Sequence, residues 1–256
     1  MNSPRYVHIL TPFHRPTSIS ALAAHLEPML VTWHPICDVR VDFPAPWIVP
    51  IFVVPPPEWD PCYWKHNYWI ETQPIVDGDW YGFMNDDDGY EPNVMDMIRS
   101  KTSSHVVVIS MKRGHHVPPD EPHGTSTLKA APENMRLCSV GVQQLFVRGY
   151  VLRTMRFVND HFADGLMVES VTRRFATTYE PNYYAQFNRF QPGRWDTGTS
   201  ATPAHCDPSQ PAYRLRQIRY TLLRTWVGLR AWVKQSLACV TARKSTRKPK
   251  RLDDGG

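Results

Sequence analysis

The chain has 256 residues, of which 42% are hydrophobic and 21% are charged, so it can bury a sizeable core, and this composition argues against global disorder. This length suits one large α/β domain with an extension, or two small domains. Five scattered cysteines without a C-x-x-C pair argue against a disulfide framework and favour free thiols in a reducing compartment, the cytoplasm. No run approaches the ~20 apolar residues of a transmembrane helix.

The net charge of +5 is divided unevenly along the chain. Residues 213–256 hold 12 of the 29 Lys and Arg residues but only 2 of the 24 Asp and Glu residues, so this segment carries +10 and the preceding body −5. The basic character of the whole sequence therefore describes the segment and not the body. Because an acidic body is a poor platform for DNA, we expect no nucleic-acid partner.

The first 40 residues predict an alternating β/α sheet. Residues 6–10 read as a strand that Thr11 and Pro12 stop, and residues 30–33 read as a second strand with Asp38 just beyond it. Between them, Thr17 or Ser18 can cap a helix that ends at Pro28. Its apolar residues fall on one face: Ile19, Leu22, Ala23 and Leu26.

The middle of the chain is less regular. Prolines break residues 42–62, residues 65–70 favour a short helix, and residues 105–110 form the most β-like run. Residues 112–134 are rich in Gly, Pro and charge, which is typical of a lid or recognition loop. Residues 135–147 and 175–179 read as later strands.

One stretch carries the chemistry. Trp80–Met84 suits a buried strand, and Asp86, Asp87, Asp88 and Gly89 follow at its carboxyl end, where open α/β sheets bind ligands. Adjacent carboxylates repel one another unless something positive lies between them, and Mg²⁺ binds through one or two carboxylates plus substrate phosphates. The sequence therefore predicts a metal-diphosphate site; a solvated Asp-rich turn is the alternative.

Two further acids lie four residues apart, which places them on one helical face. Asp160 and Asp164 precede the apolar run from Leu166, and a helix N-cap is the alternative interpretation of either one.

The order of these features resembles the GT-A fold glycosyltransferases, most closely the family 2-like group that uses nucleotide-diphosphate sugars. The resemblance covers residues 5–190 and rests on residues 10–16 after the first strand, on Trp33 and Asp38, on Lys65 and Asn67, and on a D-x-D motif at Asp86–Asp88. It implies a Rossmann-like mixed central sheet flanked by helices. We expect this catalytic domain over 1–200, a linker with an amphipathic helix over 201–240, and a disordered basic tail over 241–256.

The resemblance also implies roles for individual residues. Thr11, Pro12, Phe13 and Arg15 would lie near the base and ribose of a UDP- or GDP-sugar, Asp38 would contact the base, and Lys65 would approach the nucleotide or diphosphate. The acids would hold the ribose and a Mn²⁺ or Mg²⁺ ion, with Asp86 and Asp87 at the nucleotide, Asp86 and Asp88 at the metal, and His205 a weak further metal ligand.

The chain departs from the family where inverting members have a Glu-Asp pair at the head of a late helix. Here the dipeptide is Ala163-Asp164, so Asp164 is the expected base and Asp160 the reserve. These features predict inverting transfer of a hexose to a hydroxyl acceptor. The alternatives are a nucleotide-sugar binder without turnover, and a nucleic-acid- or membrane-binding protein that acts through its basic tail.

The segment from Tyr213 has apolar residues at helical spacing with basic residues elsewhere on the wheel. A basic amphipathic helix fits an anionic membrane surface, and a helix packed on its own domain gives the same pattern. The stripe consists of Leu215, Ile218, Leu222, Trp226, Leu229, Val233 and Leu237.

Overall fold

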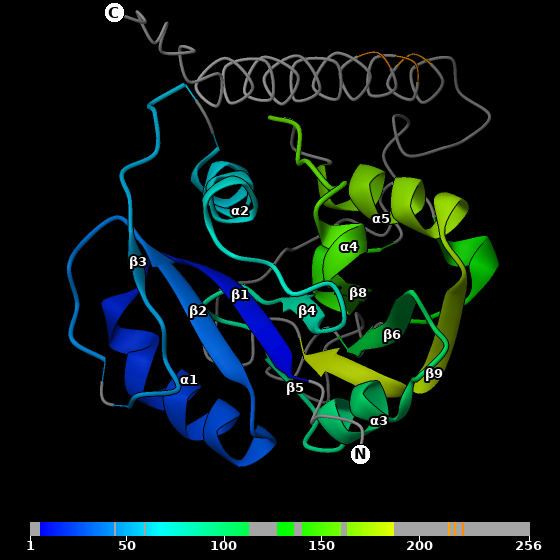
Figure 1. Cartoon of the computed structure of the whole chain (residues 1–256), viewed down its shortest axis with the longest axis horizontal. Helices are drawn as coiled ribbons and strands as arrows, with labels where there is room; N and C mark the ends of the chain where they lie inside the picture. The colour runs from blue at the N-terminus through cyan, green and yellow to red at the C-terminus, as the bar shows by residue number, and fades with distance from the viewer. Residues whose placement is uncertain are drawn as a thin grey trace, which may run out of the picture.

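The protein is described by a computed structural model over residues 6–43, 45–58, 60–112, 127–135, 140–159 and 163–186, together with Leu215, Ile218 and Leu222. These residues form a mixed α/β structure around one nine-stranded sheet, with helices on both faces (Figure 1). The strand order is β3-β2-β1-β4-β8-β6-β9-β5, and β7 pairs with β6 beside this path.

The first half of the sheet is parallel and Rossmann-like. It comprises β1 (Val7–Phe13), β2 (Thr32–Cys37), β3 (Ile51–Phe52) and β4 (Trp80–Phe83). The connections carry α1 (Ile19–Leu26) and α2 (Pro61–Thr72), with 3-10 turns at Pro16–Ser18 and Glu27–Met29. Because parallel strands end at the same edge, the segments that follow β1, β2 and β4 meet there.

The second half mixes directions. Strand β8 (Leu145–Arg148) lies antiparallel between β4 and β6 (Val106–Lys112), and β9 (Thr177–Gln186) runs parallel to β6. The short strands β5 (Gly89–Tyr90) and β7 (Thr127–Leu128) pair antiparallel with β9 and β6. The remaining helices are α3 (Val94–Ser100), α4 (Gly149–Leu152) and α5 (Ala163–Arg174), with 3-10 turns at Pro132–Asn134 and Val142–Gln144.

Each face of the sheet has its own hydrophobic layer. Helices α2, α4 and α5 cover one face, and α1 and α3 cover the other (Figure 1). Position 82 in β4 requires glycine, because a Cβ there would lie 2.5 Å from the Phe146 ring of β8, which belongs to the hydrophobic layer under α1 and α3. That close approach packs the parallel half of the sheet against the mixed half.

Several predicted elements are confirmed. Helix α1 buries the four apolar residues that its spacing selected, and β6 is a fully buried core strand until its last residue. Strand β4 matches the predicted strand before the acidic run except that it ends one residue earlier, at Phe83. Helix α2 is longer than predicted: Asp60 caps it by accepting a hydrogen bond from the Cys62 N–H, and Pro61 occupies its first turn. The predicted strand over 135–147 is wrong in extent, since β8 begins only at Leu145.

The prediction that Thr11 and Pro12 stop the first strand is also wrong, because β1 continues to Phe13 in register with β2. Strand β4 ends at Phe83, opposite Leu10, and the Leu10 carbonyl accepts from the Met84 N–H just beyond. The backbone of Pro12, like that of Leu10, points to the side of β1 on which β4 lies. Because β4 has already ended there, the missing N–H of Pro12 costs the sheet no hydrogen bond. The extra residues carry the chain directly into the opening loop, residues 14–16.

Most of the predicted lid over 112–134, and most of the segment beyond residue 186, lie outside the described residues, so the proposed domain boundaries at 200 and 240 remain predictions. Among the residues that the structure describes, no helix is long and apolar enough to cross a membrane.

Candidate functional site

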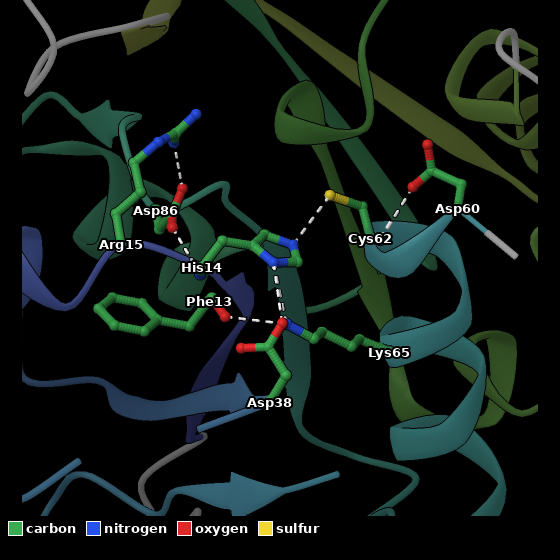
Figure 2. Close-up of polar contacts among 8 residues, drawn as sticks. All are labelled: Phe13, His14, Arg15, Asp38, Asp60, Cys62, Lys65 and Asp86. Atoms are coloured by element: carbon green, nitrogen blue, oxygen red, sulfur yellow. Dashed lines mark hydrogen bonds and ion pairs between the residues drawn. The ribbon is translucent and has the colours of Figure 1, made fainter. Parts of the chain in front are cut away.

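The carboxyl ends of β2, β1 and β4 bring together Asp38, the opening loop and the acidic turn, residues 85–88. These strands are neighbours in the sheet, so segments up to about 70 positions apart in the chain become adjacent. Helix α2 begins beside them and adds Cys62 and Lys65 (Figure 2). The result is a compact cluster of ionisable groups at the sheet edge where the sequence placed the site.

The acidic turn is buried and tied to the opening loop. Asp86, Asp87 and Asp88 are only 2%, 7% and 1% exposed, which contradicts the alternative of a solvated turn. Arg15 forms an ion pair with Asp86, and its Nη1 lies 3.1 Å from an oxygen of Asp87. The backbone N–H of His14 donates to the other Asp86 oxygen at 2.7 Å (Figure 2). The positive group expected between the carboxylates is therefore supplied, for two of them, by Arg15.

These carboxylates carry an electrostatic cost. Burial raises the pKa of Asp87, the Arg15 charge opposes that rise, and the neighbouring Asp86 charge adds to it. Asp88 contributes to the turn itself, since one of its oxygens accepts from the Asn85 N–H at 3.3 Å. Three acids and one guanidinium thus lie together in this corner, which offers the carboxylate oxygens that a divalent cation binds.

Lys65 organises the second half of the cluster. Its side chain is fully buried, and its ammonium donates to the Phe13 carbonyl at 2.9 Å and to Asp38 at 3.2 Å, and lies 3.1 Å from Nδ1 of His14. Burial lowers the pKa of Lys65 and its bond to Asp38 counteracts this. Burial raises the pKa of Asp38, but the Lys65 hydrogen bond and charge outweigh it, so the net shift is downward. Lys65 therefore fixes the end of β1 against Asp38.

His14 and Cys62 are site residues that sequence reasoning missed. Nε2 of His14 lies 3.4 Å from Sγ of Cys62, at the start of α2 (Figure 2). Burial, with a contribution from Lys65, lowers the pKa of His14, and burial raises the pKa of Cys62 to about 12. A protonated thiol can donate a hydrogen bond to a neutral imidazole, and this pair differs from the thiolate and imidazolium of an activated Cys-His nucleophile. The sequence did contain a pointer to His14, because this residue lies between Phe13 and Arg15, two residues that were predicted to lie near the nucleotide.

The remaining predicted nucleotide contacts are buried at the base of the site. Thr11 is fully buried, and its hydroxyl oxygen accepts a hydrogen bond from Nε1 of Trp33 at 2.9 Å. Pro12 is buried in β1, and the Phe13 ring packs edge-on against Trp33. These three side chains are buried in β1, directly before the opening loop, whereas those of Arg15 and Asp38 are partly exposed.

The predicted base lies on the same side of the molecule. Asp164 occupies the first turn of α5, and its charge is among those that raise the pKa of Cys62, after burial and the charges of Asp60 and Asp86. The carboxylate of Asp164 is thus within electrostatic range of Cys62. Asp160 and His205 lie outside the described residues.

The donor chemistry suits a hard cation, but the protein supplies few ligands. Carboxylate oxygens are what Mg²⁺ and Mn²⁺ prefer, and the acidic turn offers them at the expected edge. Within the described part of the chain, however, no three His, Cys, Asp or Glu residues are arranged to hold a metal ion. A cation here would therefore depend on phosphate oxygens from a ligand to complete its coordination.

No protein-family model matches the chain, and no curated protein matches it in sequence. Among solved structures, the inositol-1-phosphate CTP transferase from T. maritima is similar over 73% of this chain and 90% of that chain, with 10% sequence identity and a TM-score of 0.39. A similarity this distant assigns no activity to the present chain.

Proposed function

We propose that the protein is a metal-dependent glycosyltransferase that moves a sugar from a nucleotide-diphosphate donor to a hydroxyl acceptor, with inversion. The observation that carries the proposal is the convergence of Asp38, Arg15 and the buried acidic turn at the ends of three neighbouring parallel strands. This is the edge at which open α/β sheets bind nucleotides, and the excess of carboxylates there favours a cation with a diphosphate.

In this proposal, the partly exposed side chains of Arg15 and Asp38 recognise the donor. Asp38 is held by Lys65 with a lowered pKa, so it is an ionised acceptor for donor groups of a nucleotide base. Arg15 is 29% exposed while it pairs with Asp86 and Asp87, so its guanidinium can reach a phosphate from the position it already occupies. Thr11, Pro12 and Phe13, the other residues expected near the base and ribose, are buried in β1 directly before Arg15 and its loop.

Asp86 and Asp88 are the proposed metal ligands, together with phosphate oxygens of the donor. Asp86 already accepts from His14 and pairs with Arg15, so it joins a metal only if Arg15 moves away. When bound, the metal would neutralise the charge that develops on the departing nucleoside diphosphate. His205 remains a prediction outside the described residues.

Asp164 is the proposed base, with Asp160 in reserve. An acceptor hydroxyl must lose its proton on the face of the sugar opposite the diphosphate, and a carboxylate within hydrogen-bond reach removes it. The influence of Asp164 on the Cys62 thiol supports a location within reach of the cluster.

The decisive experiment measures thermal stabilisation and nucleoside diphosphate release across a panel of UDP- and GDP-sugars, with and without Mn²⁺ or Mg²⁺. We expect metal-dependent stabilisation and release by the wild-type chain. Asp88→Ala should abolish both, and Asp164→Asn should lower turnover by about 10²–10⁴-fold with donor affinity unchanged. The matched control is Asp96→Asn, whose carboxylate is 84% exposed and lies on α3, away from the cluster.

The other outcomes are informative. Metal-dependent binding without release for any acceptor would mean a nucleotide-sugar binder without turnover. No response to any nucleotide sugar, with salt-sensitive binding of nucleic acid through the basic segment, would refute the enzyme. Loss of donor binding in Asp164→Asn would assign that residue a structural role.

A further inference from the structure

Three apolar side chains near the C-terminal end of the chain are exposed on one helical face. Leu215, Ile218 and Leu222 are helical and 65%, 56% and 65% exposed. Spacings of three and four residues place them in one row, because an α-helix has 3.6 residues per turn.

This exposure favours a membrane surface over packing on the domain as the interpretation of the stripe. A helix packed on its own domain buries its row, as α1 does with Ile19, Leu22 and Leu26, which are 8%, 0% and 0% exposed. The two rows have the same spacing and the same kind of residue. Leu215, Ile218 and Leu222 are therefore not covered by the domain, and burial of their apolar surface elsewhere would be favourable.

The charge of the surrounding sequence limits what can cover this row. From Tyr213 to Leu252 the sequence contains 12 Lys and Arg residues and no Asp or Glu. The apolar spacing recurs at Trp226, Leu229, Val233 and Leu237. An apolar row with a large hydrophobic residue such as Trp, accompanied by a strong positive charge, is the pattern of helices that lie in the interface of anionic membranes.

We propose that this face docks on a lipid membrane with anionic headgroups, with Leu215, Ile218 and Leu222 entering the headgroup boundary. A second copy of the chain is a poorer occupant, because pairing would bring two segments of +10 together. Nucleic acid would satisfy the charge but would leave the apolar row in water. The proposal does not depend on the activity of the sheet-edge site.

Co-sedimentation of the full chain with vesicles tests the proposal. One set contains phosphatidylcholine alone, and the other also contains phosphatidylserine. We expect binding to the second set only, and weaker binding as salt is raised. The variant Leu215→Asp/Ile218→Asp/Leu222→Asp should lower the partition constant by at least about tenfold, because it removes apolar contact and adds negative charge.

A matched control separates position from charge. Val49→Asp/Val54→Asp/Val76→Asp makes the same change in net charge at valines that are 43%, 76% and 56% exposed on the body. It should bind anionic vesicles nearly as well as wild type, and thermal melting should verify that both variants fold. Equal loss in the two variants, or no wild-type binding to anionic vesicles, would overturn the proposal. So would a shift to a dimer that the first variant abolishes without any vesicle binding.

Discussion

Strands β1 and β4 carry a polar cluster near each end, and the two clusters differ in kind. Near the strand beginnings, His8 lies 2.9 Å from His34 and 3.2 Å from Asp79, and its ring stacks on Tyr81. Near the strand ends lies the cluster of Arg15, Lys65 and the acids. The first cluster is built from side chains of the strands and the residue before β4, whereas the second is built largely from the segments that follow the strands.

The difference shows that buried polar groups do not by themselves mark a site. In the first cluster, burial lowers the pKa of His34 to about 3, and that of His8 also falls, so one carboxylate faces two neutral imidazoles. In the second, Arg15 pairs with Asp86 and Asp87, and Lys65 pairs with Asp38, while Asp88 is buried beside them. The candidate site is distinguished by its two cations and several acids, which the segments after three neighbouring parallel strands bring together.

Removing Arg15 should have the largest effect on stability. Arg15→Met leaves Asp86 and Asp87 buried without their guanidinium, and we expect a loss of about 3 kcal/mol in the free energy of unfolding, measured with urea. Because Asp87 already has a raised pKa, the folded variant binds protons more readily than the unfolded chain, so its stability should fall as pH rises. The counterpart at the other cluster, Asp79→Asn, should cost less than half as much. Equal losses of stability in Arg15→Met and Asp79→Asn would contradict the proposed difference between the two clusters.

The neutral histidines at the strand beginnings should make the fold acid-sensitive. His34 has a folded pKa of about 3 against an ordinary value of 6.5, so between these values the unfolded chain binds a proton that the folded chain does not. Stability should therefore fall as pH drops below about 6.5, by about 1.4 kcal/mol per pH unit for this group. His34→Gln should flatten the dependence, as measured by urea unfolding from pH 7 to pH 4. An unchanged slope would mean that His34 does not titrate with unfolding.

Replacing the buried lysine should have the smallest effect on folding and a clearer one on binding. Lys65→Met keeps much of the volume and removes a buried charge, so the free energy of unfolding should change by less than about 1.5 kcal/mol. Asp38 loses its hydrogen bond, and its pKa should rise toward the ordinary range, as carboxyl NMR can measure. Donor affinity should fall by about tenfold, and unchanged affinity would remove Asp38 from the nucleotide site.

The sequence predicted the parts of the fold and site that depend on local pattern. The α1 stripe, the β4 strand and the position of Asp86–Asp88 at its end follow from residue spacing and composition alone. The path of β1 past Pro12 could not be predicted, because it depends on where a strand 70 residues away ends. The contacts of Lys65 with Phe13 and of Cys62 with His14 are fixed by the packing of α2 on β1, which no local pattern encodes.

One consequence concerns how a ligand would be felt beyond its contacts. The ammonium of Lys65 joins a helix to the end of a central strand and to the rim carboxylate Asp38. A molecule that engages Asp38 acts on all three at once, so it should slow amide hydrogen exchange along α2 as well as in the opening loop. Binding of a molecule at Asp38 would then be detected as slower exchange in α2, a helix that the molecule need not contact.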